Sequence, residues 1–218
     1  MKKTMLVLVA LLLGNTAAFA DDSPQRYAVT ITNVTAGQTF TPMLVVTHKP
    51  SVGLFELGEP ASDELALVAE SGDIGPLAGL LGSLPQAVYD TADSGGLLFP
   101  GDSVTVYVDA RGQFDRVSLV GMLIPTNDTF VALDSVPLSR KGRTVMVPAY
   151  DAGSEFNDEN CANIPGPTCG GAGASPGSGE GYVHISNGIH GVGDLAPAVY
   201  DWRNPVARIT VKRVKQHD

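Results

Sequence analysis

The sequence is poor in cysteine, in aromatic residues and in positive charge. Its 218 residues include 2 Cys and 6% aromatic side chains, and 14 Lys and Arg stand against 23 Asp and Glu, for a net charge of -9. The shortage of cations argues against nucleic-acid binding, because contact with phosphates needs clustered Lys and Arg. Two Cys and scattered His also lack the ligand spacing of a zinc site.

Long apolar runs are equally scarce. The one clear run lies in residues 1–20, where two lysines precede it and Ala18-Phe19-Ala20 forms a small-residue cleavage site. The run is shorter than the roughly 20 residues that span a bilayer, so it predicts a bacterial-type secretory signal peptide rather than a transmembrane segment. Removal of this peptide leaves 12 Lys and Arg against 23 acids. We therefore expect an acidic protein that is secreted or periplasmic.

Motifs of nucleophilic and phosphate chemistry are missing as well. The chain has no Gly-x-Ser-x-Gly elbow, and the glycine-rich residues 170–181 lack the helix and Lys of a phosphate-binding loop. Its many carboxylates form no obvious acid–base pair. The prediction is that the protein is not an enzyme.

Turn residues and short β-type segments are abundant. The 25 Gly and 15 Pro favour many turns over long helices. Alternating or β-branched runs predict strands at 27–33, 40–47, 103–109, 116–124, 129–133, 143–147, 182–185 and 206–214. Ser62 as an N-cap predicts a short helix over 62–70, and Pro76 in a first turn predicts another over 74–84. The strands at 103–109 and 116–124 are predicted to form a hairpin.

This order of elements predicts an all-β fold, an antiparallel β-sandwich of about eight strands with one or two short helices. Residues 21–218 are expected to form a single domain, since no linker or repeat divides them. The segment 157–181 becomes rich in Gly, Ser and Pro, and strand patterns resume after it. It is therefore predicted to be one flexible insertion loop.

The strongest local pattern is a group of acids around a glycine. Asp151, Glu155, Asp158 and Glu159 lie within one short stretch, and an Asp-x-Gly-x-acid turn can direct Asp151 and Glu155 at one point. Calcium prefers such carboxylate and carbonyl oxygens on loops. The spacing leaves two interpretations open, a calcium site or a solvated acidic loop. Asp128 by itself belongs to a turn after a strand.

The two cysteines and two of the four histidines are also candidates. In an exported chain, Cys161 and Cys169 most simply form a disulfide. His184 and His190 flank an Asn-Gly turn and have two interpretations, ligands of a transition metal or hydrogen-bonded turn residues.

Four segments in order resemble the spondin N-terminal domain family. They are MLIPTNDTFVALD at 122–134, PAYDAGSE at 148–155, PVARITVKRV at 205–214, and an upstream stretch with Leu54–Ser62 and Ala69-Glu70. The resemblance covers about residues 27–214. It implies a β-sandwich like that of calcium- and phospholipid-binding domains, with a calcium ion held by three acids at one end.

Carried over by motif, those three acids are Asp128, Asp151 and Glu155. The sequence departs from the family pattern in having Glu155 where the family has Asp and Thr129 where it has Trp. The resemblance further implies an extracellular adhesive role, with a surface glycan or protein as partner. The leading hypothesis is a secreted calcium-binding module for surface recognition. The alternatives are a metal-dependent hydrolase that uses His184, His190 and an acid, and a purely structural exported domain.

Overall fold

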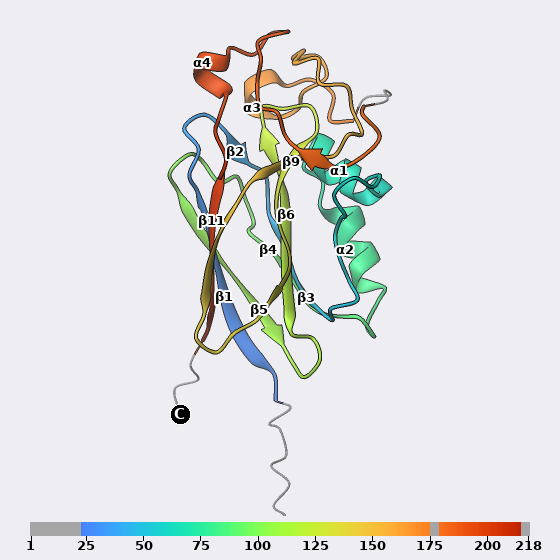
Figure 1. The fold of residues 1–218 in the computed structure, drawn as a ribbon, viewed down its shortest axis with the longest axis vertical. Helices are drawn as coiled ribbons and strands as arrows, with labels where there is room; N and C mark the ends of the chain where they lie inside the picture. The colour runs from blue at the N-terminus through green and yellow to red at the C-terminus, as the bar shows by residue number, and fades with distance from the viewer. Residues whose placement is uncertain (1–22, 175–178, 215–218) are drawn as a thin grey trace, which may run out of the picture.

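Two antiparallel β-sheets form the sandwich that the sequence predicts. The computed structural model describes residues 23–174 and 179–214, so the predicted signal peptide and a part of the predicted insertion lie outside the described residues. The smaller sheet has 4 strands in the order β5-β1-β11-β8. The larger sheet has 7 strands in the order β10-β9-β7-β6-β3-β4, with β2 paired to β6 (Figure 1).

Both predicted helices are present, and every predicted strand segment contains a strand, although the run 40–47 is divided into two strands and the run 182–185 is shortened to His184–Ile185. The smaller sheet consists of β1 (Gln25–Asn33), β5 (Ser103–Ala110), β8 (Arg143–Val147) and β11 (Ala207–Arg213). The larger sheet consists of β2 (Thr39–Phe40), β3 (Leu44–His48), β4 (Val88–Asp93), β6 (Arg116–Ile124), β7 (Thr129–Pro137), β9 (Ala149–Asp151) and β10 (His184–Ile185). The helices are α1 (Asp63–Ser71), α2 (Gly75–Gly82), α3 (Gly166–Cys169) and α4 (Pro197–Tyr200). Strands β4 and β9 and helices α3 and α4 were not predicted.

Two hydrophobic cores hold these layers together. The first fills the space between the sheets and includes Ile31, Leu119 and Ile209, each 0% exposed. The second lies between the larger sheet and helices α1 and α2, where Leu65 packs in the same cluster as Phe130 (Figure 1). Strand β6 is buried along almost its whole length because it contributes to both cores.

The predicted hairpin of residues 103–109 and 116–124 is wrong. Strand β5 pairs with β1, whereas β6 pairs with β3 and β7, so the turn between them carries the chain from one sheet to the other. The turn residues look the same in sequence whether the two flanking strands pair with each other or belong to different sheets. The distinguishing feature is burial, since β5 alternates between exposed and buried residues while β6 is buried on both faces.

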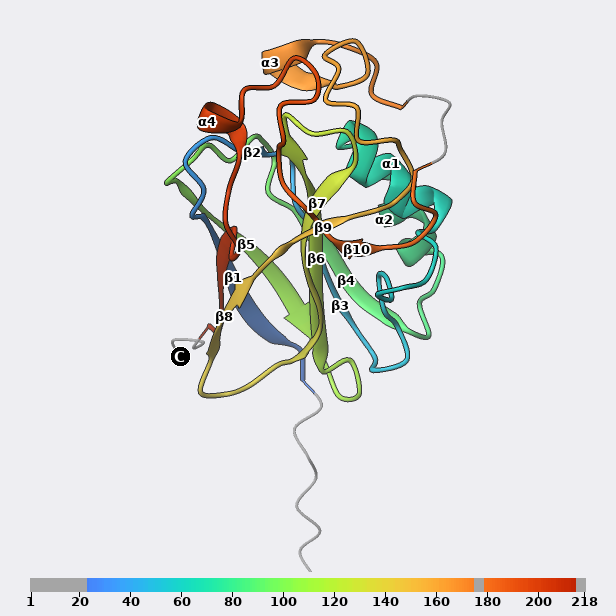
Figure 2. The ribbon, with the colours of Figure 1, turned by 45° about the horizontal axis from the view of Figure 1, so that its top comes forward.

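The connections collect at the two ends of the sandwich. The loop end contains residues 125–128, 152–174, 179–183 and 186–206, with α3 and α4 (Figure 2). The terminal end contains the start of β1, the β5–β6 and β7–β8 turns and the end of β11 (Figure 1). The loop end carries the predicted metal ligands.

Candidate metal centre

Sheet register brings three separate segments of the chain to one place at the loop end. Asp128 directly precedes β7, Asp151 ends β9 and His184 begins β10. Thr129 is the ladder partner of Asp151, and Asp151 is also the ladder partner of His184. Of the three predicted calcium ligands, Asp151 therefore ends β9, and Asp128 stands immediately before the adjacent strand β7.

The turn after β9 depends on Gly153. Its φ is 63°, in the left-handed region that favours glycine, and its N–H donates to Asp151 Oδ1 at 2.9 Å. A Cβ at this position would collide with the backbone of Tyr182. Gly181 N–H donates to the Gly153 carbonyl at 2.8 Å. The Asp-Ala-Gly motif thus both turns the chain and allows the segment before β10 to pack against it.

Asp128 organises the same turn through one of its two oxygens. Oδ2 accepts the N–H of Ser154 at 2.8 Å and the N–H of Glu155 at 2.9 Å. Oδ1 is buried and has no hydrogen-bond partner among the described residues. A buried carboxylate oxygen without a donor is costly, so this atom requires a proton or a cation for compensation.

Burial makes charge unfavourable on both aspartates. Asp128 is 0% exposed, and desolvation followed by the charge of Asp151 raises its pKa to about 7, against the hydrogen bonds from Glu155 and Ser154. Desolvation likewise raises the pKa of Asp151, although the Gly153 N–H, His184 and Asn157 oppose it. Two neighbouring carboxyl groups thus share a region that disfavours two negative charges.

Glu155, the third predicted ligand, lies in the same turn. The residue is 2% exposed, and its backbone N–H contacts Asp128. Among the described residues, however, the His and acidic side chains whose ligand atoms all lie within 4.8 Å of one another are Asp151, Glu180 and His184. The structure gathers the predicted residues into one turn, and their role as ligands stays a prediction.

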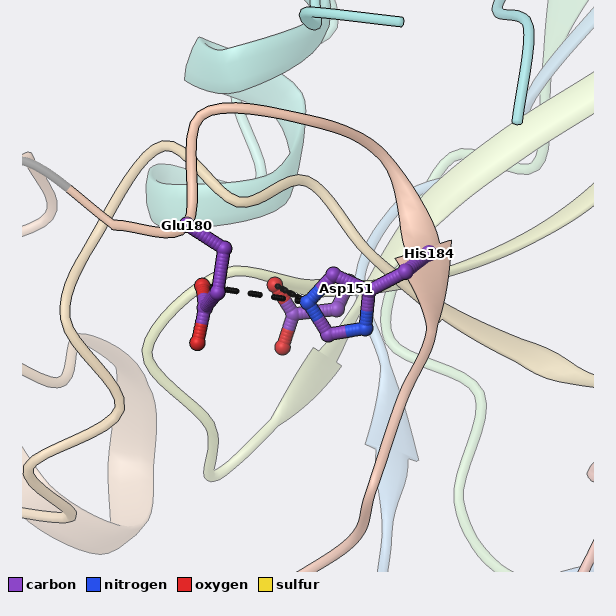
Figure 3. A group of neighbouring side chains, drawn as sticks. All are labelled: Asp151, Glu180 and His184. Atoms are coloured by element: carbon purple, nitrogen blue, oxygen red, sulfur yellow. Dashed lines mark ion pairs between the residues drawn. The ribbon is translucent and has the colours of Figure 1, made fainter. Parts of the chain in front are cut away.

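The Asp151–Glu180–His184 cluster is drawn in Figure 3, where the three side chains point toward one another. His184 Nε2 lies 3.5 Å from Asp151 Oδ1 and 3.8 Å from Glu180 Oε2. His184 Nδ1 is 2.9 Å from the Ile185 carbonyl oxygen, which can only accept, so Nδ1 is the donor. That bond orients Nε2 toward the carboxylates, an arrangement also found when a metal-binding His donates its other N–H.

Protonation of His184 is an alternative to metal binding in this cluster. Burial opposes its positive charge, but the Ile185 carbonyl, Asp151 and Glu180 outweigh burial and raise its pKa. Protonated His184 would form an ion pair with the two acids. The cluster can therefore hold either a proton on Nε2 or a metal ion.

His190 lies outside this cluster. Its side chain is 61% exposed, and Nδ1 is 4.0 Å from Glu159 Oε1. The His184–His190 pair, predicted as possible ligands of a transition metal, is thus not united in the metal-type cluster found among the described residues.

The other two acids of the stretch, Asp158 and Glu159, accept hydrogen bonds from neighbouring loops. Glu159 is 3% exposed, and its carboxylate accepts the N–H groups of Gly191 and Val192 at 2.7 and 3.0 Å. Asp158 accepts the side-chain amides of Asn127 and Asn163 at 3.0 and 2.7 Å. Asp158 and Glu159, which are outside the predicted ligand set, therefore connect neighbouring loops through hydrogen bonds.

The predicted disulfide between Cys161 and Cys169 is confirmed. It links the segment after Glu159 to α3, and Cys161 N–H also donates to Asp194 at 2.9 Å. The first part of the predicted flexible insertion is therefore cross-linked and hydrogen-bonded at the loop end.

Two acids near the site were missed as candidates. Glu180 lies in the glycine-rich segment, where neighbouring residues give no sign that β9 and β10 pair. Glu70, at the end of α1, is 8% exposed and has its pKa raised by burial, with an opposing hydrogen bond from Ser154. Ser154 also donates to Asp128, so the same serine contacts both acids. The Ala69-Glu70 pair was noted only as part of the family resemblance.

The fold and site together define a β-sandwich module with buried acids among the loops at one end. The family model of the spondin N-terminal domain (Spondin_N) matches residues 16–157, and the chain belongs to this family. The matched region includes Asp128, Asp151 and Glu155 but ends before Glu180 and His184. No curated protein matches the chain.

Family membership and the disulfide are both consistent with an extracellular or exported protein. None of the helices in the described residues combines the length and apolar character needed to cross a bilayer.

Proposed function

We propose that the protein is an exported, non-enzymatic module that binds Ca²⁺ at its loop end and presents the loops to a surface glycan or protein. Asp128, Asp151 and Glu155 are the proposed ligands. The observation that carries this proposal is Asp128 Oδ1, a buried oxygen without a hydrogen-bond partner among the described residues. It lies beside a second buried carboxylate, that of Asp151. A hard divalent cation would stabilise two neighbouring buried carboxylates of this kind.

The proposed residues fit calcium by donor type. Asp128, Asp151 and Glu155 offer carboxylate oxygens, and the turn between Asp151 and Glu155 also contains backbone carbonyls. Calcium accepts six to eight oxygens in a flexible arrangement, so Glu in place of Asp still provides a suitable ligand atom. Bound calcium would supply positive charge that offsets carboxylate repulsion.

Calcium would also act on the loops. Asp128 accepts N–H groups from Ser154 and Glu155, and Asp151 begins the turn that packs against Gly181. A cation between the two aspartates would therefore fix the relative positions of these segments. Phe156 and Tyr182, which are 68% and 45% exposed, stand next to the turn and would be presented in a defined arrangement. Aromatic side chains of this kind suit contact with a sugar ring or a protein surface.

The Asp151–Glu180–His184 cluster favours a second candidate, a transition-metal site in a metal-dependent hydrolase. The imidazole nitrogen favours a transition metal such as zinc, whereas calcium prefers oxygen ligands alone. The two candidates share Asp151 but differ in their other residues. Asp128 belongs only to the calcium site, whereas His184 belongs only to the transition-metal site, and this difference makes them separable.

Thermal unfolding of residues 21–218 tests the proposal, first with chelator and then with Ca²⁺, Mg²⁺ or Zn²⁺. At about one hundred times Kd, calcium should stabilise the fold by about 2.7 kcal/mol, which corresponds to a rise in Tm of about 5–10 °C. The Asp128→Asn variant should lose this rise, and His184→Ala should keep it. Asp102→Asn, an exposed aspartate outside the site, is the matched control and should also keep it.

A response to zinc that is lost in His184→Ala and kept in Asp128→Asn would support the second candidate instead. No response of the wild-type protein to any of these ions would overturn both.

A further inference from the structure

The terminal end contains a cavity lined by arginines, although the protein as a whole is acidic. The cavity has a volume of about 180 Å³ and lies between the start of β1, the β5–β6 turn, the β7–β8 turn and the end of β11. These segments lie together at the end of the sandwich opposite to α3 and α4 (Figure 1). Arg111, Arg140 and Arg213 come from three of them.

The terminal end also concentrates most of the other cations of the described chain. Besides the three cavity arginines, the adjoining strand ends and turns carry Arg26, Lys49, Arg116, Lys141, Arg143 and Lys212. Like charges gathered at one surface create a local positive potential even on a protein of negative net charge. An anion approaching this end therefore meets attraction that the net charge of -9 does not suggest.

Aromatic rings support several of these cations. Arg111 lies 5.8 Å from the Tyr89 ring, Tyr89 lies 5.4 Å from Phe114, and Lys49 Nζ lies 5.0 Å from Phe114. This row of cation, ring, ring and cation holds both side chains at the β5–β6 turn. A ring orients a cation without removing its positive charge, in contrast to a carboxylate.

One carboxylate does belong to the cavity lining. Asp115 lies 3.5 Å from Arg116 Nε, so its charge is shared with a cation beyond the three cavity arginines. For Arg140 and Arg213, the described residues contain no ion pair within 4.0 Å. Among the described residues that line the cavity, three arginines therefore stand against one aspartate.

We propose that this cavity binds a phosphate or sulfate ester group, with the rest of the ligand outside it. Guanidinium groups present paired N–H donors that match the oxygens of such anions, which is why arginine predominates at these sites. The volume is below the roughly 300–1,000 Å³ of pockets that enclose a drug-sized ligand, so a small charged group fits this space better than a whole ligand. A neighbouring hollow of about 270 Å³ shares Arg111, Gly112 and Phe114 and provides room for the adjoining part of the ligand.

Titration of inorganic phosphate into residues 21–218, followed by backbone amide NMR shifts, tests this proposal. The titration is done in chelator, because the proposed calcium site then stays empty and cannot contribute. We expect saturable shifts at Gly112 and at the β7–β8 turn. The double variant Arg140→Gln Arg213→Gln should bind at least about tenfold more weakly, because each lost guanidinium removes charge-assisted hydrogen bonds.

Two further variants make the outcome decisive. Arg208→Gln removes an exposed charge from β11, the strand of Arg213, but lies outside the cavity lining and should leave binding unchanged. Arg140→Lys keeps the charge and should weaken binding less than Arg140→Gln, even if the double variant fails to fold. Absence of saturable shifts in the wild-type protein, or equal loss in Arg208→Gln, would overturn the proposal.

Glucose 6-phosphate and vesicles that contain phosphatidic acid then distinguish the source of the group. Binding of the sugar phosphate alone supports a soluble or glycan ester, and co-sedimentation with the vesicles supports a lipid headgroup. Loss of the interaction in the double variant is required in either case.

Discussion

At the loop end, Asp128 and Asp151 lie buried next to each other. At the terminal end, the exposed Arg140 and the half-buried Arg213 line a cavity at the surface. Repulsion between like charges is strong at the buried loop end, because water cannot screen it. It is weak at the exposed terminal end, because water can screen it. The loop end should therefore couple its own stability to protons and metal ions, whereas the terminal end can bind an anion with little change in the fold.

The largest effect should be a pH dependence that arises at the loop end. In chelator, burial raises the pKa of Asp128 to about 7, so between about pH 4 and pH 7 the folded state binds more protons than the unfolded state. Stability is therefore greatest at low pH within this window and falls as pH rises through about 7. Urea unfolding at about pH 5 and about pH 8 measures this decrease.

Calcium and Asp128→Asn should each reduce that decrease, since one compensates the charge and the other removes it. Arg140→Gln, at the terminal end, should leave it unchanged. If Asp128→Asn unfolds with the same pH dependence as the wild-type protein, another group causes it and the contrast between the two ends fails.

A glycine substitution should give the next largest effect. Gly153→Ala places a Cβ at a φ of 63° and against the Tyr182 backbone, which we expect to lower the free energy of unfolding by about 3–4 kcal/mol and to weaken calcium binding. Gly79→Ala is the control, because Gly79 lies in helix α2 with no atom near its Cβ position. That substitution should stabilise the protein by about 0.5–1 kcal/mol. Equal effects of the two variants would show that the turn at Gly153 tolerates a side chain.

Local patterns were sufficient to predict most of the fold. Alternation identified β1 and β5, and the Ser62 cap identified α1, whose Leu65 N–H donates to Ser62 Oγ at 3.2 Å. They were not sufficient for β9, which is only 3 residues long, and they predicted the strand at 182–185 longer than β10, which has 2 residues. Such short strands exist because β7 provides a template for β9, and β9 for β10, so tertiary pairing rather than local sequence forms them.

The candidate site was predictable to a similar extent. The Asp-x-Gly-x-acid spacing indicated Asp151 and Glu155, and family resemblance added Asp128. Glu180 and His184 could not be connected with Asp151, because that proximity depends on the β9–β10 register. The role of Glu159 also could not be predicted, because its carboxylate accepts the N–H groups of residues 190–192, which are remote in sequence.

The smallest of these effects should come from the disulfide. Replacement of Cys161 and Cys169 by Ser should lower the free energy of unfolding by about 2–3 kcal/mol, the loop-closure value for a ring of this size. Hydrogen bonds of Glu159 and Asp158 still hold the adjacent loops, so calcium should bind to the variant with only a modest loss of affinity. Urea unfolding and calcium titration measure the two quantities, with phosphate binding at the terminal end as the internal control. Loss of calcium binding together with intact phosphate binding would show that the cross-link, rather than the hydrogen bonds, positions the acidic turn.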